Sequence, residues 1–126
     1  MSDTRARPKQ KLPVGAVADF PVGAFRLITV GEREIGVIRL PNGEIHAMRN
    51  RCPHKAAPIC RGLVGGTALP SAPGQLIYGR DGEVVACPWH GFEYDIRSGE
   101  ELYQAKPTRL RKYPVDIEDG QVVLTV

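Results

Sequence analysis

Two short cysteine–histidine pairs constrain this chain of 126 residues more than any other feature. The first is Cys52-Pro53-His54 and the second is Cys87-Pro88-Trp89-His90, each with a proline directly after the cysteine. Together they supply two sulfur and two nitrogen ligands, a set that suits a tetrahedral zinc ion or an iron–sulfur cluster of mixed ligation. Zinc fingers usually group their cysteines in one place and their histidines in another. Here each loop contributes one of each, which favours the two-iron cluster and leaves structural zinc as the alternative.

The sequence around both pairs resembles the cluster motifs of the Rieske iron–sulfur family. The resemblance rests on Cys52-Pro53-His54-Lys55 and on the run Cys87-Pro88-Trp89-His90-Gly91-Phe92-Glu93-Tyr94-Asp95. It implies a [2Fe–2S] cluster in which two cysteines bind the inner iron and two histidines bind the outer iron. The implied ligands are Cys52, Cys87, His54 and His90.

The resemblance is closest to the soluble ferredoxin branch of this family. Respiratory-type members carry an extra cysteine in each loop and join the loops by a disulfide, whereas this chain has Ala57 and Trp89 at those positions. The third cysteine, Cys60, is then expected to be a partly buried free thiol. No stretch of the sequence has the apolar length that crosses a bilayer, so we expect a cytoplasmic protein.

Five residues beside the ligands are expected to support the cluster: Pro53, Pro88, Trp89, Gly91 and Tyr94. The prolines stiffen both loops, and the glycine permits close approach of the backbone. High-potential Rieske proteins place a serine two residues after the second histidine and a tyrosine two residues further on. Here these positions hold Phe92 and Tyr94, which predicts a potential in the lower part of the family's range of about −150 to +300 mV.

Short apolar runs separated by turn residues predict an all-β domain. The resemblance implies an antiparallel β barrel or sandwich with an inserted cluster-binding subdomain of loops and short strands. We expect hairpin turns at Pro41-Asn42-Gly43, Arg80-Asp81-Gly82 and Glu118-Asp119-Gly120. The predicted strands are residues 25–30, 35–40, 45–48, 76–78, 84–86, 92–94, 113–117 and 121–126.

The predicted organisation is a basic, mobile N-terminal arm over residues 1–13 followed by a single domain over residues 14–126. The cluster-binding loops span about 49–62 and 86–95. A segment rich in glycine and proline predicts an extended loop over about 63–75.

The expected function is electron transfer from a flavin-containing reductase to a terminal oxygenase or similar oxidoreductase. The alternative is a fixed electron-transfer subunit of a larger oxidoreductase, like a nitrite reductase small subunit. The chain has three histidines, and two are assigned to the cluster. Because a mononuclear oxygenase iron usually takes two histidines and a carboxylate, we expect no catalytic iron site and no enzyme activity of its own.

Basic residues gather in the first cluster loop, at Arg49, Arg51, Lys55 and Arg61, and predict a docking face for an acidic protein partner. The net charge of +3 equals the charge of the N-terminal arm, and no basic face is interleaved with aromatics. We therefore expect neither nucleic-acid nor membrane binding. We expect a monomer or weak oligomer, with the remaining histidine, His46, at the surface.

Overall fold

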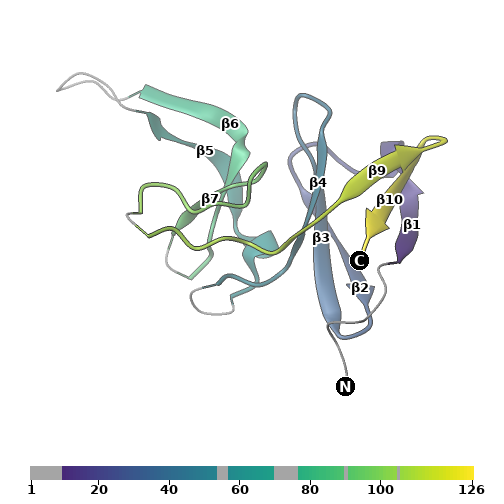
Figure 1. Ribbon diagram of the computed structural model, residues 1–126. Helices are drawn as coiled ribbons and strands as arrows, with labels where there is room; N and C mark the ends of the chain where they lie inside the picture. The colour runs from purple at the N-terminus through teal and green to yellow at the C-terminus, as the bar shows by residue number, and fades with distance from the viewer. Residues whose placement is uncertain (1–9, 54–56, 70–76, 90, 105) are drawn as a thin grey trace.

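The computed structural model describes residues 10–53, 57–69, 77–89, 91–104 and 106–126. In these ranges the chain forms three antiparallel sheets (Figure 1), which confirms the predicted all-β class. The helices there are two single 3-10 turns, Val17–Asp19 and Ile59–Arg61. None of these described helices is long and apolar enough to span a bilayer.

Ten strands make up the sheets. The first sheet has the order β1-β10-β9, with bounds Lys11–Ala16, Gln121–Thr125 and Val115–Glu118. The second has the order β2-β3-β4-β8, with bounds Phe25–Val30, Arg33–Arg39, Ile45–Arg49 and Lys112–Tyr113. The third has the order β5-β6-β7, with bounds Leu63–Leu69, Ile77–Ala86 and Glu93–Asp95.

The β2-β3-β4-β8 sheet is the middle layer, and β3 and β4 are buried on both faces. Successive side chains of a strand point to opposite faces. Val37 of β3 and Ala47 of β4 therefore enter one core, while the next residues, Ile38 and Met48, enter the other. Burial on both faces explains why β3 is apolar at consecutive positions instead of alternating with polar residues.

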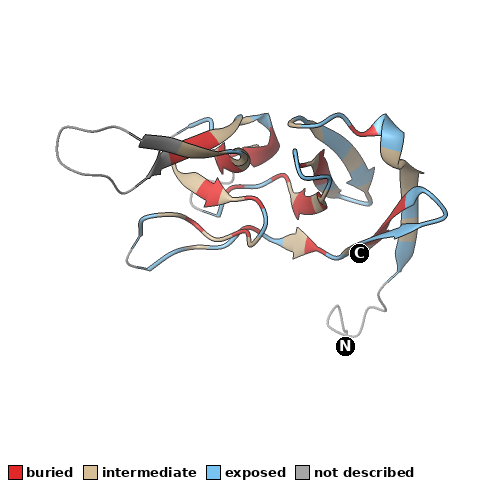
Figure 2. Ribbon diagram, turned by 90° about the horizontal axis from the view of Figure 1, so that it is seen from above, coloured by how far each residue is buried: buried red, intermediate tan, exposed pale blue. Residues whose placement is uncertain are grey.

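The molecule divides at this sheet into two halves. We call residues 10–49 and 112–126 the sandwich half, and residues 50–111 the loop half. Figure 1 shows β5, β6 and β7 on one side of β3 and β4, with β1, β9 and β10 on the other. Figure 2 shows buried residues gathered along the inner surfaces of both halves.

Local sequence signals placed several elements correctly. Strand β2 has the predicted bounds. The Asn42-Gly43 turn joins β3 to β4, with Gly43 at a φ of 93° and its N–H donating to the Leu40 carbonyl at 2.9 Å. The C-terminal hairpin of β9 and β10 is also confirmed, with Gly120 at a φ of 75°.

The predicted hairpin across Arg80-Asp81-Gly82 is wrong. Strand β6 continues through these residues, since Thr67 of β5 lies opposite Gly79 and Gly65 lies opposite Val84. Residues 80–83 form a bulge, with Arg80 at a φ of 58°. Positive φ values serve a bulge as well as a turn, so the turn signal marked an irregularity without reversing the chain.

Two predicted boundaries also change. β1 begins at Lys11, inside the segment assigned to the mobile arm, because it pairs with β10 from Lys11 opposite Thr125. The predicted extended loop begins too early, since residues 63–69 form β5. The rest of the arm, residues 1–9, and residues 70–76 lie outside the described ranges.

His46 is not the surface residue that we expected. Its side chain is 19% exposed and lies between Glu44 and Lys112. The Lys112 Nζ donates to Nδ1 at 2.6 Å, so Nε2 carries the proton and donates to the Glu44 carboxylate at 3.0 Å. Glu44 also accepts from Arg97 of the loop half at 2.9 Å, so this network ties the two halves together.

Candidate metal centre

The first cysteine loop leaves the end of β4. Cys52 is 1% exposed, and its backbone N–H donates to the Ala57 carbonyl at 2.7 Å. This bond closes a loop of the residues between them. The cysteine thereby lies in the core while Pro53, the next residue, is exposed.

The second cysteine loop joins β6 to β7 and closes in the same way. Cys87 is 3% exposed, and its N–H donates to the Phe92 carbonyl at 2.8 Å. In both loops the cysteine bonds the residue five positions later. Gly91 lies at a φ of 72°, which favours glycine, and its N–H donates to the Cys87 carbonyl at 2.9 Å.

Tyr94 connects the two loops. It follows the second loop in β7, is fully buried, and places its hydroxyl 3.6 Å from the Cys52 sulfur. Both cysteines and Tyr94 belong to the same hydrophobic cluster of the loop half. Burial raises the pKa of the Tyr94 phenol well above its usual value, so the hydroxyl keeps its proton at neutral pH.

The other predicted site residues occupy the outer side of the loops. Pro53, Pro88, Trp89 and Gly91 are exposed, and Trp89 is 58% exposed. His54, Lys55 and His90 lie outside the described residues. Among the residues that are described, no three ligand-type side chains form a metal site, and the two cysteines remain the described part of the predicted set.

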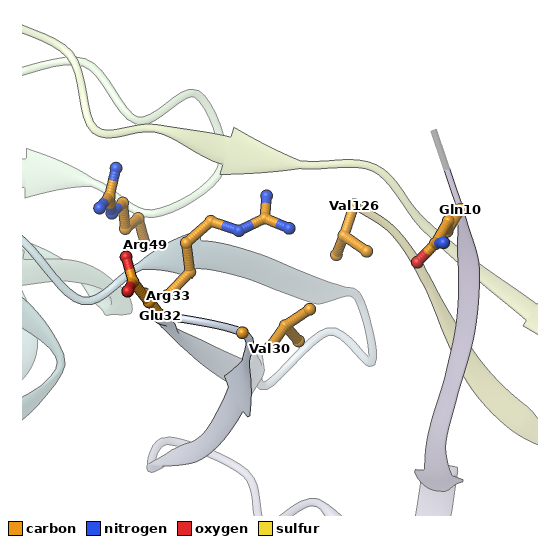
Figure 3. Close-up of a pocket in the computed structure, with 7 residues that line it drawn as sticks. Gln10, Val30, Glu32, Arg33, Arg49 and Val126 are labelled. Carbon is orange, nitrogen blue, oxygen red and sulfur yellow. The ribbon is translucent and has the colours of Figure 1, made fainter. Parts of the chain in front are cut away.

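The predicted basic face is divided. Arg51 and Arg61 are exposed. Arg49 is half-buried and lines a pocket of the sandwich half with Arg33 and Glu32 (Figure 3). Neither Cys52 nor Cys87 lines this pocket.

One exposed apolar residue near the second cysteine was not predicted from the sequence. Leu63 is 78% exposed and lines a shallow pocket with Arg61, Cys87 and Pro88. A leucine at the start of a strand predicts burial, and no local signal marked it as exposed.

Cys60 is a buried packing residue, and all three cysteines are free thiols. Its backbone N–H donates to the Asn50 side chain at 2.7 Å, and Asn50 in turn donates to Glu34 at 2.6 Å. Burial raises the pKa of the Cys60 thiol to about 12. The predicted absence of a disulfide between the loops agrees with these thiols.

The described side chains fit an iron–sulfur cluster. The two cysteines are brought from separate loops into one apolar core, where thiolates are shielded from water, and a hydroxyl lies beside one of them. Cluster-binding sites have this combination of buried thiolates and nearby hydrogen-bonding groups. The fold and the paired loops thus define a small β protein with a candidate metal centre in its loop half.

Comparison with known proteins agrees with this class. The family model described as the Rieske [2Fe-2S] domain matches residues 10–114. The anthranilate 1,2-dioxygenase ferredoxin subunit of Burkholderia cepacia is 31% identical over 114 residues, covering 90% of this chain and 90% of that protein. The solved Sphingomonas yanoikuyae B1 ferredoxin has a TM-score of 0.69 and 26% identity, covering 93% of this chain and 99% of that one.

A longer relative shares the same region. Apoptosis-inducing factor 3 of Mus musculus is 31% identical over 108 residues, which are 86% of this chain and 15% of that protein. The chain belongs to the Rieske [2Fe-2S] domain family, whose cofactor is a [2Fe–2S] cluster.

Proposed function

We propose that this chain carries one electron at a time on a [2Fe–2S] cluster held by Cys52, His54, Cys87 and His90. The observation that carries the proposal is the matched pair of loops, each closed by a bond from its cysteine to the residue five positions later. The Tyr94–Cys52 contact supports a shared centre between them. When bound, the cluster supplies reversible one-electron chemistry.

In this proposal the two cysteines and the two histidines have different roles. Cys52 and Cys87 would hold the cluster from within the core, where their sulfurs are shielded from water. In the sequence His54 follows the exposed Pro53 and His90 follows the exposed Trp89, so we assign to these two histidines the side of the cluster that a partner would approach. A redox partner then needs to approach only the loop tips, and no substrate has to contact the metal.

The docking face comprises Arg51, Arg61, Leu63 and Trp89, with Lys55 as its sequence-predicted member. The exposed leucine and tryptophan supply apolar contact, and the arginines favour an acidic partner and a salt-dependent association rate. The proposed face excludes Arg49, which lines the pocket of the sandwich half.

The proposed partners are a flavin-containing reductase and a terminal oxygenase or similar oxidoreductase. The relationship to a dioxygenase ferredoxin subunit over nearly its whole length supports this choice. Phe92 brings no hydroxyl to the second loop, which supports a potential in the lower part of the family's range. A cytoplasmic setting, a monomeric or weakly oligomeric state, and no nucleic-acid or membrane partner stay predictions.

The second candidate is an electron-transfer unit fixed within a larger oxidoreductase, like a nitrite reductase small subunit. The match to 15% of a longer relative favours it, because the same region there is one part of a larger chain. A free carrier would purify without a partner, whereas a fixed unit would copurify with one.

Electron paramagnetic resonance of the anaerobic, dithionite-reduced protein tests the proposal, with iron and zinc counted on the same sample. We expect two irons per chain and a rhombic signal of low average g value that titrates as a one-electron couple. Cys52→Ser should lose the signal, while the matched variant Cys60→Ser changes a buried cysteine outside the set and should keep it. One zinc and no signal in the unaltered protein would contradict the proposal.

A further inference from the structure

A line of side-chain contacts leads from the first cysteine to a buried carboxylate. The Tyr94 hydroxyl lies 3.6 Å from the Cys52 sulfur and 3.2 Å from the Thr108 hydroxyl. Thr108 Oγ1 lies 3.1 Å from Oε1 of Glu101, which is 5% exposed. The Cys52 sulfur therefore lies at one end of a polar path that continues past the motif residue Tyr94 to Thr108 and Glu101, which lie outside the motif.

The backbone holds this path in place. Glu101 N–H donates to the Thr108 carbonyl at 3.0 Å, and Thr108 N–H donates to the Glu101 carboxylate at 3.0 Å. Leu110 N–H donates to the Gly99 carbonyl at 2.8 Å next to this pair. Thr108 is thus fixed against Glu101 from both its backbone and its side chain.

Counting protons sets the direction of the hydrogen bonds between Thr108 and Glu101. Glu101 Oε1 accepts the Thr108 N–H, so it presents lone pairs to the Thr108 hydroxyl, which donates its one proton to the same oxygen. Thr108 Oγ1 then offers only lone pairs to Tyr94. Tyr94 has one hydroxyl proton, and a proton donated to Thr108 is not available to the Cys52 sulfur.

The contact distances agree with this assignment. The oxygen–oxygen contact of 3.2 Å is within hydrogen-bonding reach, and the 3.6 Å contact to sulfur is compatible with a phenol oxygen that does not donate. A carboxylate at the end of the line strengthens the bonds that lead to it, because charge-assisted bonds are roughly twice as strong as neutral ones.

Resting on the proposed function, we propose that Thr108 and Glu101 are positioning residues that hold the Tyr94 proton away from Cys52 and thereby lower the reduction potential. A hydrogen bond to a cluster sulfur favours the reduced, more negative state. Withholding that bond leaves the oxidised state relatively favoured. The motif tyrosine therefore raises the potential only when residue 108 cannot accept its proton.

The test is a set of potential titrations on the cluster-loaded protein. Thr108→Val keeps the side-chain shape and removes the acceptor, so Tyr94 turns its proton to Cys52 and the midpoint potential rises. Thr108→Ser retains the hydroxyl and stays at the unaltered value. In a Tyr94→Phe background, Thr108→Val should give no further rise, which separates the proton effect from any change in the field of Glu101.

If Thr108→Val does not fold, the single variant Tyr94→Phe tests the proposal. The proposal expects a potential no lower than that of the unaltered protein, whereas a fall would show that Tyr94 donates to Cys52 and would overturn it. A second readout is electron–nuclear double resonance in deuterium oxide. Thr108→Val should gain an exchangeable proton coupled to the reduced cluster, and Thr108→Val/Tyr94→Phe should lose it.

Failure of this inference differs from failure of the proposed function. If the unaltered protein holds no two-iron cluster, the proposed function fails. If every variant holds two irons and the rhombic signal, but Tyr94→Phe lowers the potential and Thr108→Val leaves it unchanged, the positioning role is wrong while the electron-transfer function stands.

Discussion

The two hydrophobic cores, one of the sandwich half and one of the loop half, lie on opposite faces of the central sheet and have different chemistry. The core of the sandwich half consists of apolar and aromatic side chains, among them Phe20, Ile35 and Leu124. The core of the loop half contains all three cysteines and Tyr94. The core of the sandwich half consists only of packed side chains, whereas two side chains in the core of the loop half are proposed metal ligands. We infer that one half is the scaffold and the other half depends on its cofactor.

The largest effect should come from removing a proposed ligand. Cys87→Ser should lose all cluster iron, and the loop half should then open, because metal binding to a site that the unfolded chain lacks contributes directly to folding. Hydrogen exchange should rise by more than about tenfold in residues 50–111 and stay unchanged in β1, β9 and β10. Equal opening of both halves would show that the halves are not separable in this way.

A substitution in the core of the sandwich half should lower the stability of the protein without changing its reduction potential. Leu124 is fully buried, and Leu124→Ala should lower the free energy of unfolding by about 2–5 kcal/mol through lost apolar contact and a residual cavity. Chemical denaturation measures this loss. The reduction potential of the folded protein should not move, and a shifted potential would contradict a purely supporting role.

The seam between the halves should show coupling. A Cβ on Gly36 of β3 would overlap the Cys60 sulfur, so Gly36→Ala should cost about 1–3 kcal/mol from overpacking. Removing the sulfur should relieve part of this cost, so Gly36→Ala should be less damaging in a Cys60→Ala background. Strict additivity of the two changes in denaturation would mean that the two residues do not pack together.

The smallest effect should be a pH dependence at the same seam. Burial lowers the pKa of His46 below its ordinary value of 6.5, and Lys112 and Arg97 add to the lowering, while the hydrogen bond that His46 donates to Glu44 opposes it. The unfolded state therefore takes up a proton first as the pH falls through about 6.5, and the free energy of unfolding decreases by at most about 1.4 kcal/mol per pH unit. Above that pH the contribution of His46 is fully present.

Denaturation midpoints of the unaltered protein and of His46→Gln across pH 5–8 measure this slope. The difference between them isolates His46 from the two proposed ligand histidines. An equal slope in both proteins would contradict the burial of a neutral His46.

The extent to which the sequence predicts this molecule depends on how local each signal is. Asn42-Gly43 and Glu118-Asp119-Gly120 specify hairpins through nearby backbone preferences, and both hairpins form. Arg80-Asp81-Gly82 carries a similar local signal. Strand β6 pairs with β5 on both sides of these residues, however, so they form a bulge and not a hairpin turn. Tertiary pairing is invisible in a short window of sequence.

The site shows the same division. The cysteine motifs and Tyr94 can be recognised from residues that are close together in the sequence, and the structure places Tyr94 beside Cys52. Thr108 and Glu101 reach Tyr94 only through the folded chain, and neither belongs to a recognisable motif. Their contribution could not be predicted without the positions of the backbone segments that carry them.

The most direct test of the central claim is nitrogen-coupled pulsed electron paramagnetic resonance on the reduced protein with 15N-labelled histidine. Two sulfurs and two nitrogens from two loops predict couplings to two histidine nitrogens. Both couplings should be kept in His46→Asn, whereas His54→Asn and His90→Asn should each lose the cluster signal. A reduced cluster with no coupled histidine nitrogen, or a sample that holds one zinc and no cluster, would contradict the account.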